Sequence, residues 1–120
     1  MSKIKKAVVF GGTGFLGSNV ADALTENGFL VRIFDCDESP YIYGNQEMII
    51  GDIMDMEEVI AAVQDADVVY HFAGIADISE ANQKPIEAGK YNSLGTGNIL
   101  DACAQKKLPR FVLADRNSHE

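Results

Sequence analysis

The chain has 120 residues, 47% of them apolar, which is enough for the core of one domain but not of two. Its 18 acidic and 10 basic residues give a formal net charge of −8, which argues against a nucleic-acid partner. No apolar stretch approaches the roughly 20 residues of a membrane span, and no signal-peptide core follows Met1. We therefore expect a cytoplasmic protein without a membrane partner.

The cysteines and histidines do not predict a metal site. Cys36 and Cys103 lack metal-ligand spacing, and His71 and His119 do not form a ligand cluster. We expect Cys103 to be buried on a helix. His71 lies within an apolar run, which favours a packed, hydrogen-bonded histidine over a ligand.

The first predicted element is a buried strand over residues 4–10 that leads into a glycine turn. The glycines read either as Gly12-x-Gly14-x-x-Gly17 or as Gly11-x-x-Gly14-x-x-Gly17. A Cβ at Gly11 or Gly12 would resist the backbone angles of such a turn. Gly14 permits close approach to a pyrophosphate, and Gly17 permits close packing of the next helix. The unpaired N–H groups at that helix N-terminus favour an anion.

A helix over about residues 15–27 follows, with Leu16, Val20 and Leu24 facing the sheet and Gly28 ending it. The second strand, residues 30–34, leads into Asp35, 24 positions after Gly11. A carboxylate there can accept hydrogen bonds from both ribose hydroxyls of an adenosine and repels a 2′-phosphate, so NAD is favoured over NADP. The alternative is that Asp35 is only a solvated strand end.

Three further strands are predicted over residues 47–50, 68–73 and 111–114. Between the first two, Asp55 and Glu58 predict a capping box, followed by an apolar stripe of Met56, Val59, Ile60 and Val63.

A longer helix is expected from Pro85 to about Lys106, interrupted by Gly89, Gly95 and Gly97. These glycines indicate close backbone approach to the sheet or to a ligand, of which packing on the sheet is the simpler explanation.

The continuous apolar strands and the alternation with helices predict an α/β fold: a doubly wound parallel sheet of order 3-2-1-4-5 with helices on both faces. In such a sheet the ligand binds across the carboxyl ends of the strands, at the point between strands one and four where the order reverses. The connection over residues 36–46 fits this fold less well, because it is short for a crossover between parallel strands.

Five segments together resemble the N-terminal, cofactor-binding half of an extended short-chain dehydrogenase/reductase of the NAD-dependent sugar-nucleotide epimerase/dehydratase group, whose fold is Rossmann-like. The resemblance covers residues 5–114, and its marks are GGTGFLG at 11–17, Asp35, GDIMD at 51–55, HFAG at 71–74 and NSLGTGNIL at 92–100.

The resemblance implies a role for each of these segments. It implies that the pyrophosphate is bound by Gly11, Gly14, Phe15, Leu16 and Gly17, the adenosine ribose by Asp35, and the adenine by the Asp52 side chain and an Ile53 backbone group. It places Phe72, Ala73 and Gly74 beside the phosphates and nicotinamide ribose, with Asn92 near that end. Two alternatives stay open: Asp52 as a turn residue before a helix, and Asn92 as an interior polar bridge.

The chain departs from the family pattern in its catalytic motifs. None of Tyr41, Tyr43, Tyr70 and Tyr91 has a lysine four positions on, so the Tyr-x-x-x-Lys pair is absent from these residues, and Asp115 and Arg116 stand where serines are expected. We expect a dinucleotide-binding domain over residues 1–114, a tail over 115–120 that includes Ser118, no catalytic residue and no turnover by this chain alone.

Two hypotheses follow from this departure. The chain is the NAD-binding domain of an enzyme whose parent family acts on nucleotide sugars, or it is a stand-alone, non-catalytic binding or assembly module. An apolar fifth strand at the sheet edge also predicts a homodimer.

Overall fold

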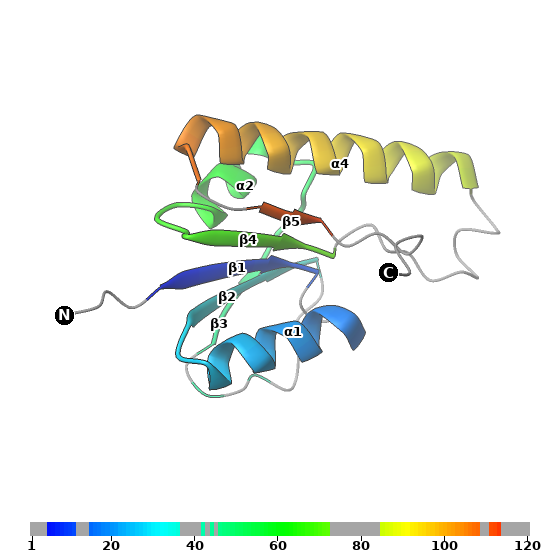
Figure 1. The fold of residues 1–120 in the computed structure, drawn as a ribbon. Helices are drawn as coiled ribbons and strands as arrows, with labels where there is room; N and C mark the ends of the chain where they lie inside the picture. Colours follow the sequence, from blue (N-terminus) through cyan, green and yellow to red (C-terminus); the bar gives the residue numbers. More distant parts are fainter. Residues whose placement is uncertain are drawn as a thin grey trace.

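The computed structural model describes residues 5–11, 15–36, 42, 44, 46–72, 85–108 and 111–113. Its sheet has five parallel strands in the order β3-β2-β1-β4-β5 (Figure 1). The strands are β1 (Lys6–Phe10), β2 (Leu30–Asp35), β3 (Glu47–Ile50), β4 (Val68–His71) and β5 (Phe111–Leu113). The predicted parallel, doubly wound sheet and its strand order are confirmed.

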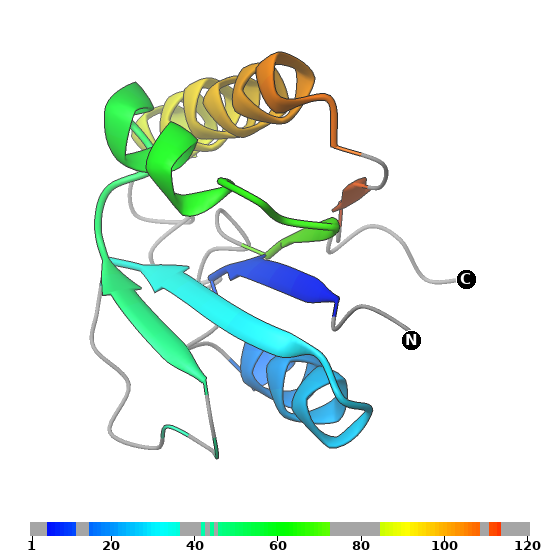
Figure 2. The same cartoon turned by 90° about the vertical axis from the view of Figure 1, so that its left-hand side faces the viewer.

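Helices cover both faces of this sheet. They are α1 (Phe15–Glu26), α2 (Met56–Ala62) and α4 (Pro85–Lys106). Helix α1 lies on one face, and α2 and α4 lie together on the other (Figure 2). The predicted bounds of α4 are confirmed, and α1 ends one residue earlier than expected. No helix in the described ranges is both long and apolar enough to cross a bilayer.

The alternation of side chains along the strands creates two core layers. On β1, Ala7 and Val9 belong to the layer under α1, whereas Val8 and Phe10 belong to the layer under α2 and α4. Every residue of β1 except Lys6 is buried, as expected for a central strand with helices on both sides.

The helix ends follow local chemistry. Gly28 has a φ of +90°, the left-handed conformation expected of a residue that ends a helix. At the start of α2, the Asp55 carboxylate accepts from Glu57 N at 3.1 Å and Glu58 N at 3.3 Å. The reciprocal half of the predicted capping box is wrong, because Asp55 N instead donates to the carbonyl of Asp52.

Arg32 links the sheet to the end of α2. Its Nη1 donates to the carbonyls of Ala62, at 2.7 Å, and Gln64, at 3.2 Å, and its Nε pairs with Glu47 Oε1 at 2.8 Å. Carbonyls at a helix C-terminus have no partner within the helix, so the guanidinium satisfies the Ala62 carbonyl at the end of α2 and the Gln64 carbonyl just after it. This long-range contact fixes α2 over β2 and β3.

The short connection between β2 and β3 contacts α1. Gln46 is buried, and its Nε2 donates to Asp22 Oδ1 at 2.9 Å and to Thr25 Oγ1 at 3.0 Å. Residues 37–41, 43 and 45 of the connection lie outside the described residues.

Candidate functional site

The turn after β1 stands at the carboxyl edge of the sheet. Gly11 has a φ of +83°, and its N–H donates to the carbonyl of Phe34 at 2.8 Å. Helix α1 begins at Phe15, so its N-terminus faces this same edge (Figure 1). A side chain at Gly11 would be strained in this conformation, as the sequence predicted. The edge therefore has a glycine turn followed by the positive end of a helix dipole.

The other residues predicted to bind the pyrophosphate are described only in part. Phe15 and Leu16 open α1, but their side chains lie outside the described part of the chain. Gly17 is buried in the first turn of α1, and its role in close helix packing stays a prediction. Gly12 and Gly14 lie outside the described residues.

Asp35 is the last residue of β2 and lies next to the glycine turn. The register pairs Phe10 with Phe34, which places Asp35 level with Gly11 on the neighbouring strand. The Asp35 carbonyl accepts from Gly51 N at 2.9 Å, so the chain leaving β3 is tied to the same point. Three predicted segments thus converge at the ends of β1, β2 and β3.

Asp52 forms the turn that leads into α2. Its Oδ1 accepts from Met54 N at 2.9 Å, and its carbonyl accepts from Asp55 N at 2.9 Å. The interpretation of Asp52 as a turn residue before a helix is confirmed. Asp52 is also exposed at the carboxyl edge, so its predicted contact with adenine stays a prediction beside that structural role.

Ile53 connects this turn to α4. Its side chain is 3% exposed, and its carbonyl accepts from Asn98 Nδ2 at 2.9 Å. A Cβ placed on Gly95 would lie 2.7 Å from Ile53 Cγ1, so only glycine lets the helix approach so closely. The close approach predicted for the α4 glycines is real at Gly95, but it is to the loop after β3 rather than to the sheet. Gly97 has nothing within 4 Å of such a Cβ.

The end of β4 forms the other side of the edge. Phe72 is partly buried against the α1 core layer, and its N–H donates to the carbonyl of Phe10 at 2.7 Å. Ala73 and Gly74 lie outside the described residues. Asn92 is part of α4, and its side chain also lies outside what the structure describes.

His71 is the last residue of β4 and is 2% exposed. Its Nε2 lies 2.9 Å from Thr96 Oγ1 on α4, and its ring meets the ring of Phe10 nearly at right angles. Its Nδ1 is buried without a hydrogen-bond partner among the described residues. Burial lowers the pKa of this imidazole from 6.5 to about 4. The predicted packed, hydrogen-bonded histidine is confirmed, and it is neutral at pH 7.

The described ranges contain no group of three or more histidine, cysteine or carboxylate side chains placed to hold an ion. Cys103 is buried on α4, as expected, and burial raises the pKa of its thiol to about 11. Cys36 is exposed.

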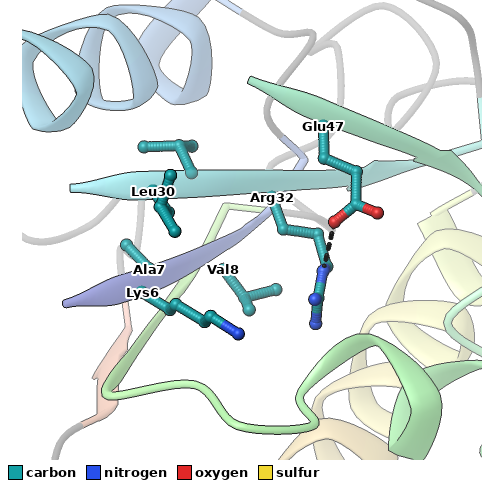
Figure 3. Close-up of a pocket in the computed structure, with 7 residues that line it drawn as sticks. Lys6, Ala7, Val8, Leu30, Arg32 and Glu47 are labelled. Atoms are coloured by element: carbon teal, nitrogen blue, oxygen red, sulfur yellow. Dashed lines mark hydrogen bonds and ion pairs between the residues drawn. The ribbon is translucent and has the colours of Figure 1, made fainter. Parts of the chain in front are cut away.

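A cavity of about 200 Å³ lies at the opposite end of the sheet (Figure 3). It is lined by amino-terminal residues of β1, β2 and β3: Lys6, Ala7, Val8, Leu30, Val31, Arg32 and Glu47. The Arg32 guanidinium beside it is already paired with Glu47. Because ligands of doubly wound sheets bind at the carboxyl ends of the strands, we do not assign this cavity to the predicted site.

Sequence reasoning missed Thr96 and Asn98 as partners of the site loops. Both lie in the segment 92–100 that carries the resemblance, but they were not given roles. Two polar side chains next to glycines inside a helix are a sign of attachment to another element, because helix interiors favour neither residue type.

Comparison with known proteins gives a consistent result. The family described as "NAD dependent epimerase/dehydratase family" matches residues 7–115. A 3-beta-hydroxysteroid dehydrogenase of Mycolicibacterium neoaurum is 34% identical over 94% of this chain and 32% of its own length. A UDP-N-acetyl-alpha-D-glucosaminuronate decarboxylase of Bacillus cytotoxicus is 35% identical over 86% of this chain and 34% of its own length.

Solved structures agree with these relatives. An epimerase from Methanothermobacter thermautotrophicus has a TM-score of 0.85 and 29% identity, covering 96% of this chain and 36% of the epimerase. A uronate dehydrogenase from Agrobacterium tumefaciens, solved in complex with NAD, has a TM-score of 0.80 and 27% identity, covering 94% of this chain and 41% of that protein. The chain therefore spans about a third of the length of the curated relatives it matches.

Proposed function

This chain belongs to the NAD dependent epimerase/dehydratase family, and we propose that it binds NAD, in preference to NADP, across the carboxyl edge of its sheet. We further propose that it forms the cofactor-binding part of an enzyme that acts on a nucleotide sugar. NAD, when bound, accepts and returns a hydride, while the residues of this chain bind and orient it.

One observation carries the proposal: the left-handed turn at Gly11 is tied to Phe34 and stands level with Asp35. A diphosphate needs unpaired N–H groups, which the start of α1 supplies, and a ribose needs an acceptor, which Asp35 supplies. The start of α1 follows β1, and Asp35 ends the adjacent strand β2, so the two recognition elements lie side by side at one edge, as a dinucleotide requires. In this proposal Gly11, Gly14, Phe15, Leu16 and Gly17 surround the pyrophosphate.

The adenine end is held by the loop after β3. The Asp52 carboxylate accepts a hydrogen bond from the adenine amino group, and the main chain of Ile53 supplies the second contact. The Ile53 carbonyl accepts from Asn98, and in this proposal the Ile53 N–H is the backbone group that contacts adenine. Phe72, Ala73, Gly74 and Asn92 line the phosphate and nicotinamide side.

The substrate class is proposed from the relatives. The decarboxylase relative is named for a nucleotide-sugar substrate, whereas the hydroxysteroid dehydrogenase relative is named for a steroid. The 120 residues contain no Tyr-x-x-x-Lys pair, so they do not themselves supply the side chains that would transfer a proton to or from the substrate. A non-catalytic dinucleotide-binding or assembly module is the second candidate.

A calorimetric titration with NAD and with NADP tests the cofactor proposal. We expect heat of binding with NAD and weaker binding with NADP. Asp35→Ala removes the ribose acceptor and the repulsion of a 2′-phosphate, so it should reduce the preference for NAD over NADP. Asp101→Ala is the matched control, because Asp101 is exposed on α4 and the same charge is lost. An unchanged preference in Asp35→Ala would assign the role to another residue, and absence of binding would reject the proposal.

An absorbance assay of NAD reduction with a panel of nucleotide sugars separates the two candidates. We expect no turnover by this chain, because the Tyr and Lys pair is absent from it. Turnover would reject the non-catalytic module, and it would also reject the interpretation that the chain is inactive because it lacks the Tyr-x-x-x-Lys pair. We also propose a homodimer through the β5 edge; sedimentation showing only monomer at high concentration would argue against it.

A further inference from the structure

Asn98 lies outside the proposed site but donates a hydrogen bond to the loop after β3, which holds the adenine in the proposed function. Its Nδ2 donates to the Ile53 carbonyl at 2.9 Å, although the two residues are 45 positions apart. That carbonyl belongs to the peptide group between Ile53 and Met54. The N–H of the same peptide group, on Met54, donates to Asp52 Oδ1 at 2.9 Å. One peptide group is therefore held at both ends, by Asn98 and by the Asp52 carboxylate.

The planarity of the peptide makes these two hydrogen bonds dependent on each other. In a trans peptide the C=O and N–H point in opposite directions, and the structure has no cis peptide bond among the described residues. Fixing the direction of the Ile53 carbonyl therefore also fixes the direction of the Met54 N–H, and with it the position of Asp52 Oδ1. The close contact between Gly95 and Ile53 holds the helix and the loop at this separation.

We propose that Asn98 is a positioning residue that orients the Asp52 carboxylate for recognition of a 6-aminopurine. This inference rests on the proposed function, in which Asp52 accepts from the adenine amino group. Asn98 does not touch the cofactor in this account. It determines how well the carboxylate is placed before the cofactor binds, and pre-organised groups bind more tightly and more selectively.

The choice between two purines reports this orientation. Adenine presents an amino donor at position 6, and hypoxanthine presents a carbonyl oxygen there. A carboxylate held toward that position attracts the first and repels the second. A carboxylate free to turn away discriminates less, even in a fully folded protein. The ratio of the two affinities therefore measures orientation, and a general loss of stability does not change it.

The experiment compares binding of NAD and of nicotinamide hypoxanthine dinucleotide by calorimetry. The wild-type chain should prefer NAD by about tenfold or more, the worth of one hydrogen bond to a charged group. Asn98→Ala should narrow the preference to about threefold or less. Asn98→Leu, similar in size and without a donor, serves as the second variant, and Asp101→Ala on the same helix should keep the wild-type ratio.

A double-mutant cycle separates action through Asp52 from independent action. Asp52→Asn keeps a side-chain oxygen for Met54 N–H but lacks the carboxylate. If Asn98 acts through Asp52, adding Asn98→Ala to Asp52→Asn should narrow the ratio no further. Additive effects of the two substitutions would overturn the inference.

Two other results have distinct meanings. If the wild-type chain discriminates and both Asn98 variants lose affinity for the two dinucleotides by the same factor, the ratio is kept and the inference is overturned, while the proposed function stands. If the wild-type chain binds neither dinucleotide, the proposed function fails and the inference fails with it.

Discussion

The buried imidazole of His71 is expected to make the fold lose stability in mild acid. In the folded chain the pKa of His71 is lowered to about 4 by burial, whereas in the unfolded chain it returns to about 6.5. Above the unfolded pKa both states are neutral at this residue, and its stabilising contribution is complete. Between about pH 6.5 and pH 4 the unfolded state binds a proton that the folded state does not, so the free energy of unfolding falls as the pH falls.

The size of this loss follows from the difference between the two pKa values. Each unit of difference corresponds to about 1.4 kcal/mol, so His71 alone should remove on the order of 3 kcal/mol by about pH 4. Domains of this kind are stable by roughly 5–15 kcal/mol, and such a loss is therefore measurable. The cause is physical: a charged imidazole would be buried between β4 and α4, with Thr96 as its one described hydrogen-bond partner.

Urea unfolding followed by circular dichroism, repeated from about pH 8 to pH 4, measures the effect when the chain is compared with His71→Phe. Phenylalanine keeps an aromatic ring beside Phe10 but cannot titrate. All other titratable groups are the same in both proteins, so their contributions cancel in the difference. We expect the difference in unfolding free energy between wild type and variant to fall by about 3 kcal/mol across the range. A difference that stays constant would refute the reasoning, because His71 would then bind protons equally in both states.

Three further sets of substitutions, at Arg32, at Asp55 and at the α4 glycines, probe long-range contacts and a helix cap by the same unfolding assay. Arg32→Lys should cost about 1–2 kcal/mol, because an ammonium cannot reach Glu47 and the carbonyls of Ala62 and Gln64 together. Asp55→Ala should cost about 1 kcal/mol through the lost N-cap, whereas Asp55→Asn should cost only a few tenths. Gly95→Ala should cost about 1–3 kcal/mol through collision with Ile53, whereas Gly97→Ala should stabilise by up to about 1 kcal/mol.

Each of these three has an outcome that would contradict it. Equal stability of Arg32→Lys and the wild type would mean that the guanidinium contacts contribute nothing beyond charge. If Asp55→Asn were as costly as Asp55→Ala, the carboxylate charge rather than the cap would be the cause. If Gly95→Ala and Gly97→Ala had the same effect, the loss would come from helix propensity alone and not from the contact with the loop.

Local chemistry explains what could be predicted from the sequence. The strand order follows from the alternation of apolar strands and helices, and the left-handed Gly11 and Gly28 are each required by a turn that no other residue adopts cheaply. The reciprocal capping bond of Glu58 was predicted from spacing alone and is wrong. Spacing does not show that the backbone of Asp52 turns back to accept the Asp55 N–H.

Contacts between distant segments could not be predicted in this way. Nothing in the sequence around Arg32 indicates that its guanidinium contacts the end of α2, because its partner Ala62 lies 30 positions later in the chain. The place of Asp35 beside the glycine turn, by contrast, could be predicted, because neighbouring parallel strands end at the same edge of the sheet. A single sequence gives the type of each element, but the side chains that join elements depend on where the helices dock.

The amino-acid composition of α4 gives one sequence signal of contacts between this helix and other elements. Gly95, Thr96 and Asn98 are all poor helix formers, and together they cost on the order of 2 kcal/mol relative to alanine. In the structure each has a tertiary partner: Gly95 meets Ile53, Thr96 meets His71, and Asn98 binds the Ile53 carbonyl. Residues that weaken the isolated helix thus attach it to the loop after β3 and to the end of β4, both at the carboxyl edge. A run of poor helix formers inside a helix that still forms is therefore evidence of docking, and here it identifies the face of α4 that holds the proposed cofactor site in place.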